Sequence, residues 1–113
     1  MILALLLAAV AQPAPTPAWL AGRWVPVSDA SAQDAEACAG EEARSWRADG
    51  SYASMQEGGV WRLTAGKLTE WPYDAEGEPT GGASRVSRLQ RIAPDRLRLT
   101  DIDGEQVEWR RCR

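Results

Sequence analysis

Apolar residues occur along most of this chain in short alternating runs rather than at helical spacing. From Arg44 onward each run ends at Gly, Pro or Asp-Gly, which is typical of strands joined by turns. With the segment that begins at Gly22 added, the pattern predicts eight strands, at residues 22–28, 45–48, 51–55, 60–64, 67–73, 84–92, 96–102 and 105–112. After the first pair the loops are short, so consecutive strands are antiparallel neighbours. The sequence therefore predicts an all-β meander that closes into a small eight-stranded barrel, with an open, strongly bent sheet as the alternative.

Three local features refine this pattern. Asp49-Gly50 lies between two strands and predicts a type I′ hairpin turn, and Asp103-Gly104 is a second hairpin signal. In the strand 84–92, apolar and Arg residues each recur every three positions, so we expect a β-bulge there. Residues 28–43 are rich in Ala and Glu, and we expect a long loop with one or two helical turns, capped by Ser28 or Asp29 and broken at Gly40.

The N-terminus indicates export. Residues Ile2 to Val10 are continuously apolar, and Ala9-Val10-Ala11 is a small-x-small cleavage site, which together are typical of a secretory signal peptide. The run is too short to cross a bilayer, so no transmembrane segment is expected in the mature chain. The sequence predicts a signal peptide at 1–11, a Pro-rich extended lead-in at 12–18 and one domain at 19–113. The expected location is the periplasm or the exterior.

The two cysteines, Cys38 and Cys112, carry the next prediction. An even number of cysteines in a small exported domain favours a disulfide, whereas a cytosolic chain would hold two free thiols. The bridge would close a loop of about 75 residues and would add about 4 kcal/mol of stability on the chain-entropy account.

Composition excludes most enzymatic chemistry. The chain has no His, which removes Ser-His-Asp and Cys-His catalysis and most zinc sites, and no Gly-rich phosphate loop is present. Carboxylate pairs occur in expected loops or turns, where solvated surface charge is the simplest interpretation; they are Glu41/Glu42, Glu76/Glu78 and Asp101/Asp103. We therefore expect no enzyme activity, no metal and no cofactor. A net charge of −3 and a pI near 4.9 argue against a nucleic-acid partner.

Gly22-Arg23-Trp24 at the start of the first strand, a meander, and an Arg in the last strand together resemble the lipocalin-like (calycin) barrels. The chain also looks like short exported bacterial proteins of this layout, for which no function is known. The resemblance implies that Trp24 closes the barrel floor and packs against Arg110 or Arg111. If Trp109 faces inward, strand alternation selects Arg111 and turns Cys112 outward. A cation–π contact of Arg111 with Trp24 is then expected.

Six tryptophans and no Phe give two interpretations. They line a site for a small hydrophobic ligand, with Trp46, Tyr52, Trp61 and Trp71 as candidates, or they fill the barrel, which eight strands leave just wide enough for side chains. We favour the filled barrel. A second candidate surface, for an anionic partner, is the arginine group; its members are Arg85, Arg88, Arg91, Arg96 and Arg98, and a solvated outer face is the simpler interpretation.

These observations favour a non-enzymatic exported binding module for a small hydrophobic ligand or an envelope component. The alternative is an exported protease inhibitor, because small β-barrel metalloprotease inhibitors also open with Gly-x-Trp, although their cysteines are placed differently. In that case residues 12–19 would supply the inserting tail. A void lined by Trp61 or Trp71 would favour the first function, and a packed barrel with an extended N-terminal arm would favour the second. Neither observation excludes a third class, a purely structural stress or envelope protein.

Overall fold

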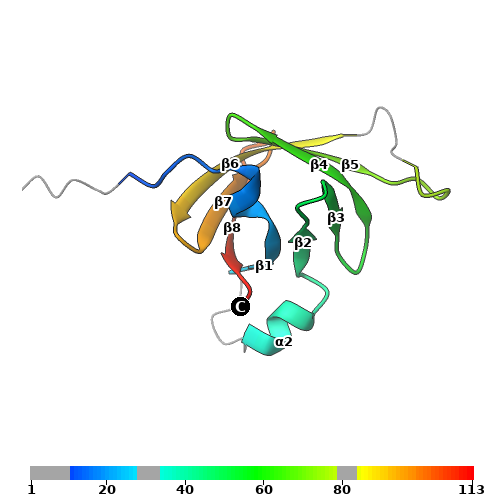
Figure 1. The fold of residues 1–113 in the computed structure, drawn as a ribbon, viewed down its shortest axis with the longest axis horizontal. Helices are drawn as coiled ribbons and strands as arrows, with labels where there is room; N and C mark the ends of the chain where they lie inside the picture. Colours follow the sequence, from blue (N-terminus) through cyan, green and yellow to red (C-terminus); the bar gives the residue numbers. More distant parts are fainter. Residues whose placement is uncertain (1–10, 28–33, 79–83) are drawn as a thin grey trace, which may run out of the picture.

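The computed structural model describes residues 11–27, 34–78 and 84–113, and these form one closed antiparallel barrel in meander order (Figure 1). The predicted all-β barrel is thereby confirmed, and the open sheet is excluded. The elements in chain order are α1 (Pro17–Leu20), β1 (Gly22–Pro26), α2 (Asp34–Ala39), β2 (Arg44–Trp46), β3 (Ser51–Ala53), β4 (Gly58–Thr64), β5 (Lys67–Pro72), β6 (Arg85–Ala93), β7 (Arg96–Thr100) and β8 (Gln106–Arg111).

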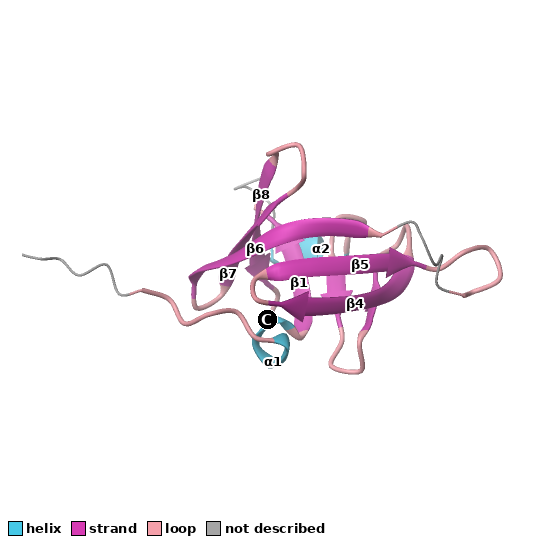
Figure 2. Ribbon diagram, turned by 90° about the horizontal axis from the view of Figure 1, so that it is seen from above, coloured by secondary structure: helices cyan, strands magenta, loops and turns pink. Residues whose placement is uncertain are grey.

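The barrel closes because β1 pairs with both β2 and β8. Antiparallel order then places the connections alternately at two ends. One end, which we call the closed end, holds α1 and the turns at 47–50, 65–66 and 94–95. The other, which we call the open end, holds the turns at 54–57 and 101–105, the loop that follows β5, and the connection from β1 to β2 that contains α2. Figure 2 shows β4, β5 and β6 side by side, α1 beside the barrel, and the N-terminal arm leading away.

The barrel interior is filled by every second side chain of each strand, because successive side chains of a strand point to opposite faces. Tyr52 and its neighbours fit closely because Gly59 lies opposite: a Cβ there would come within 2.6 Å of the Tyr52 ring and 2.3 Å of the Trp71 carbonyl oxygen. The core consists of Leu20, Trp24, Trp46, Tyr52, Trp61, Leu63, Leu68, Leu89, Leu97, Leu99 and Trp109.

The turn at Asp49-Gly50 differs in type from the prediction. A type I′ turn needs positive φ at both central residues, and only Gly50 has it here, with φ +90°. Gly50 instead donates to the Arg47 carbonyl at 3.0 Å and ends a longer loop. The reason lies in Asp49, whose carboxylate accepts from the Ser51 backbone and hydroxyl groups at 2.8 and 2.7 Å. The Ser51 hydroxyl bond is also the main cause of a lowered pKa for Asp49. Positive φ at both positions occurs at Ala65 and Gly66, φ +51° and +77°.

The other local predictions have mixed outcomes. The bulge in the sixth strand is confirmed, because the pairing of β6 with β7 shifts between Arg91 and Ala93. Helix α2 lies inside the predicted loop and ends at Ala39, directly before the predicted break at Gly40, while the predicted caps Ser28 and Asp29 lie outside the described residues.

The lead-in departs from the expected extended chain at Pro17. Residues Pro17–Leu20 form one helical turn, because Thr16 caps it through a 3.1 Å bond from the Trp19 amide and proline suits a first helical position. None of the helices described is long and apolar enough to cross a membrane.

Candidate functional site

The closed end is sealed by Trp24, which is fully buried. Its indole Nε1 donates to the Leu20 carbonyl at 2.9 Å, and the Arg111 guanidinium carbon lies 4.4 Å from its ring centroid. Gly22 makes this contact possible: a Cβ there would lie 2.9 Å from Arg111 Nη1, and the φ of +143° favours glycine. The Gly-x-Trp motif thus supplies the ring and the space beside it for the guanidinium.

Trp19 completes the seal from α1. The Trp19 ring lies edge-on to Trp24, with 5.1 Å between the ring centroids. The guanidinium carbon of Arg91 lies 4.7 Å from the centroid of the Trp19 ring. Arg111 also lies over this ring, at 5.5 Å, and donates to the carbonyl oxygens of Trp19 and Ala21.

The predicted pairing of Cys38 with Cys112 is present. A disulfide joins them with 5.9 Å between Cα atoms, and it fixes α2 against the outer face of β1. Arg23 reinforces the junction, since its Nε donates to the Cys38 carbonyl and its own carbonyl accepts from Cys112 at 2.7 Å. A disulfide is consistent with an oxidising compartment.

The open end has a different construction, centred on Glu70, which is 1% exposed. Arg44 Nη1 lies 3.0 Å from Glu70 Oε2, and Arg85 Nε lies 3.1 Å from Oε1. Both arginines also pair with Glu57, and the Trp46 indole donates to Glu70 at 3.0 Å. We call Arg44, Glu57, Glu70 and Arg85 the mouth cluster. Two guanidiniums and two carboxylates alternate in it, so the buried carboxylate is fully compensated.

This cluster changes the titration of two neighbouring groups. Burial raises the pKa of Tyr52 to about 12, and the carboxylates of Glu57 and Glu70 contribute. Burial works against the charged form of Arg85, but hydrogen bonding and attraction to the same carboxylates outweigh it, so the pKa of Arg85 is raised. At neutral pH Tyr52 is therefore a neutral phenol and Arg85 a cation.

Two adjoining recesses open beside the mouth cluster, and both are lined by Arg44, Val107 and Trp109. The inner recess, about 200 Å³, extends to Glu70 and Arg85. The rim recess, about 350 Å³, extends outward; its further lining residues are Pro26, Glu41, Glu42, Ser54 and Gln56. Ligand pockets usually have roughly 300–1,000 Å³, so the inner recess is small and charged rather than a spacious apolar cup.

Exposed apolar side chains gather at this same end. Of the described residues, four large hydrophobic ones are exposed: Met55 at 67%, Tyr73 at 39%, Ile102 at 85% and Val107 at 43%. They belong to the β3–β4 turn, the loop after β5, the β7–β8 turn and the start of β8. All four connect or flank strands at the open end, and none lies at the closed end.

The predicted ligand residues do not line an accessible cavity. Trp46, Tyr52 and Trp61 are core residues with 0%, 1% and 8% exposure. Trp71 lies on the outer face, because Leu68 and Glu70 take the inward positions of β5 and strand alternation turns residue 71 away. The indole that does line the mouth is Trp109.

The predicted arginine surface is likewise divided. Arg85 belongs to the mouth cluster and Arg91 to the closed end, so both point inward, whereas Arg88 lies on the outer face. On the outer face Arg96 and Arg98 both pair with Glu108, at 3.4 and 3.7 Å. A spacing of three residues in a strand sends alternate arginines to opposite faces, so these five do not form one patch.

Sequence reasoning missed Glu70 and Arg44. One signal was available: in residues 67–72, Leu68 and Glu70 share a face, so an inward Leu implies an inward carboxylate that needs a cationic partner. The described residues contain no cluster of His, Cys, Asp and Glu able to hold a metal ion.

Comparison of the chain with profiles of known protein families, with curated protein sequences and with solved structures finds no match.

Proposed function

We propose that this chain is a non-enzymatic, lipocalin-like binding module, exported to the periplasm or the exterior, that contacts an envelope component through its open end. The disulfide and the apolar N-terminal run of the sequence support the location.

The observation that carries the proposal is the placement of exposed apolar side chains. Met55, Tyr73, Ile102 and Val107 all surround the same end, and exposed apolar groups gathered beside polar ones mark interaction surfaces. The two recesses at this end offer Trp109 and Val107 to an apolar group of the partner and the mouth cluster to a polar one.

The dimensions favour a partner that touches the mouth over a small hydrophobic ligand enclosed in the barrel. An enclosed ligand would need the volume now occupied by Trp46 and Trp61, both in the core. It would also have to pass Glu70, whose carboxylate is held by two arginines.

Photo-crosslinking tests this proposal. We would place p-benzoylphenylalanine at Met55 or Tyr73 and, as controls on exposed residues near the closed end, at Ala48 or Thr64. After irradiation of cells that export the chain, we expect the same discrete adduct from both open-end positions and none from the controls. Failure of both open-end positions, or equal adducts from all four, would overturn it.

One observation favours the second candidate, a protease inhibitor. The barrel is packed, and residues 11–16 extend from it without helix or strand (Figure 1). An extended chain of this kind fits a protease cleft. If this is the function, the oxidised chain inhibits an exported protease and loses inhibition when residues 12–16 are deleted. Inhibition retained by the deleted chain would contradict a role for the arm.

A further inference from the structure

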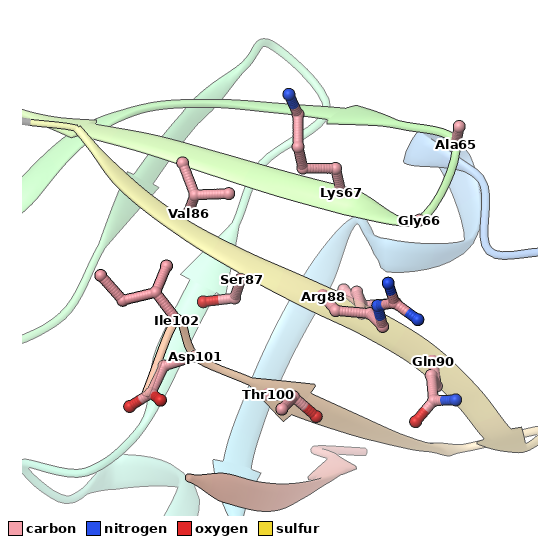
Figure 3. Close-up of a pocket in the computed structure, with 11 residues that line it drawn as sticks. Ala65, Gly66, Lys67, Val86, Ser87, Arg88, Gln90, Thr100, Asp101 and Ile102 are labelled. Carbon is pink, nitrogen blue, oxygen red and sulfur yellow. The ribbon is translucent and has the colours of Figure 1, made fainter. Parts of the chain in front are cut away.

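A groove of about 580 Å³ lies on the outside of the barrel and borders the inner recess, with which it shares Ser87 and Asp101. Its walls come from the β4–β5 turn with the start of β5, from β6, and from the end of β7 with the following turn (Figure 3). Lys67 comes from β5, Arg88 and Gln90 from β6, and Thr100 from β7. The groove therefore lies where three adjacent strands present their outer faces, and we call it the outer groove.

Two cations lie on adjacent strands of the outer groove, with their charged ends pointing in different directions (Figure 3). Lys67 and Arg88 are directly opposite in the β5–β6 register, both are exposed, and neither makes an ion pair with the residues described. Like charges directly opposite on one sheet face are destabilising. The other four arginines of the group predicted from the sequence each have an ionic or aromatic partner; they are Arg85, Arg91, Arg96 and Arg98. An anion between Lys67 and Arg88 would relieve their repulsion.

The groove is also polarised along its length. Val86 and Ile102 lie at one end of it, whereas Arg88 and Gln90 lie at the other (Figure 3). Asp101 is the one carboxylate in the lining, and its Oδ1 accepts from the backbone of Asp103 and Glu105 at 2.9 and 3.0 Å. Because Asp101 lies beside Ile102 (Figure 3), its negative charge is at the apolar end and the charge at the other end remains positive.

We propose that the outer groove binds a small anionic amphiphile. Its phosphate or carboxylate head lies between Lys67 and Arg88, within reach of the polar side chains of Gln90 and Thr100, and its apolar body covers Val86 and Ile102. The volume lies within the usual range for small-molecule sites. The groove contains none of the four residues of the mouth cluster, although it shares Ile102 with the exposed apolar residues of the open end. The proposal rests on Lys67 and Arg88 and not on the function proposed for the open end.

The proposal is tested by titrating the oxidised protein with decyl phosphate below its micelle-forming concentration. Binding is monitored by NMR through the backbone amide chemical shifts. We expect saturable shifts at Gly66, Lys67, Arg88 and Thr100. Arg88→Thr and Lys67→Thr should each weaken binding about tenfold or more, because each removes a charge-assisted contact while keeping a residue suited to a strand. Arg62→Thr is the matched control: it removes the same charge from the same outer face, opposite Thr69, without lining the groove.

Decanoate should bind at the same amides, whereas neutral decyl maltoside and inorganic phosphate alone should bind at least tenfold more weakly. Equal weakening by Arg62→Thr would show unspecific attraction to charge and would overturn the site. Equal binding of decyl maltoside would overturn the anionic head, and equal binding of phosphate would overturn the apolar body. Shifts confined to residues of the mouth would place the ligand at the open end and would overturn the outer groove as its site.

Discussion

At both ends of the barrel an inward arginine lies over aromatic rings, but its hydrogen-bond partners differ. At the closed end Arg111 lies over two indoles and donates to backbone carbonyls, and helix α1 brings Trp19 to cover the junction. At the open end Arg44 and Arg85 face the carboxylate of Glu70, and both line the inner recess. Strand alternation turns an arginine inward at both ends, but Trp19 of α1 covers the arginine of the closed end, whereas those of the open end border a recess. The open end therefore keeps recesses and exposed apolar groups.

The two ends also differ in how many of their buried polar atoms have a hydrogen-bond partner. In the described part of the chain, four buried side-chain polar atoms lack a hydrogen-bond partner. Three of them adjoin the open end, Arg44 Nε, Tyr52 Oη and Trp109 Nε1, and one, Arg91 Nε, lies at the closed end. Buried polar groups ordinarily have hydrogen-bond partners, and the open end leaves more of them without one than the closed end does.

The largest expected effect on stability concerns Trp24, which seals the closed end. Trp24→Ala should lower the free energy of unfolding by about 3–5 kcal/mol, because it removes a fully buried ring and the surface on which Arg111 rests. Urea denaturation of the oxidised protein measures this. Trp71→Ala is the control, on the half-buried outer face, and should lower the same quantity by about 1–2 kcal/mol. Similar losses for the two variants would refute the sealing role of Trp24.

The disulfide should matter almost as much. Cys38→Ser should lower the free energy of unfolding by about 4 kcal/mol in oxidising buffer, because the bridge joins residues 74 positions apart and restricts the unfolded chain. In reductant the variant and the parent chain should unfold at the same denaturant concentration. A variant that matches its parent in both buffers would mean that the bridge does not form in solution.

Breaking the mouth cluster should have a somewhat smaller effect. Glu70→Leu leaves Arg44 partly buried without its main counter-ion, so we expect a loss of about 3 kcal/mol in unfolding free energy. The double variant Glu70→Leu with Arg44→Met should recover most of this loss, since an apolar pair can replace a buried ion pair. If the double variant is less stable than Glu70→Leu alone, the two charges do not compensate each other.

The smallest effect appears only in alkali. The pKa of Tyr52 is raised from 10.0 to about 12 in the folded chain, so the folded chain holds this proton more tightly than the unfolded one. The stability that depends on neutral Tyr52 is complete below pH 10 and is lost as the pH rises from about 10 to about 12, by about 2–3 kcal/mol. Denaturation at several pH values measures the loss, and Tyr52→Phe should abolish this part of it. An unchanged pH profile in Tyr52→Phe would contradict the assignment.

The closed end could be predicted from the sequence and the open end could not. Gly22, Trp24 and Arg111 form a recognisable group, and the inward position of Trp109 was enough to choose Arg111 over Arg110. At the open end, hydrophobicity favoured Trp71 as an inward residue, but the period of two in β5 gives that place to Glu70. A single charged residue in a strand normally indicates an outer face. The burial of Glu70 depends on Arg85 of the neighbouring β6 and on Arg44 of β2, which the pattern within β5 does not reveal.

The most direct test of the central claim, that the barrel interior is a packed core and contacts occur outside it, is ¹⁹F NMR of the oxidised protein labelled with 5-fluorotryptophan. Single Trp→Phe variants would assign the six resonances, and fatty acids, retinoids and isoprenoids would be titrated in. We predict that any response is confined to Trp109 at the mouth and Trp71 on the outer face, while Trp24, Trp46 and Trp61 stay unchanged. Saturable shifts of the Trp46 or Trp61 resonance would reveal an internal ligand cup and contradict the account.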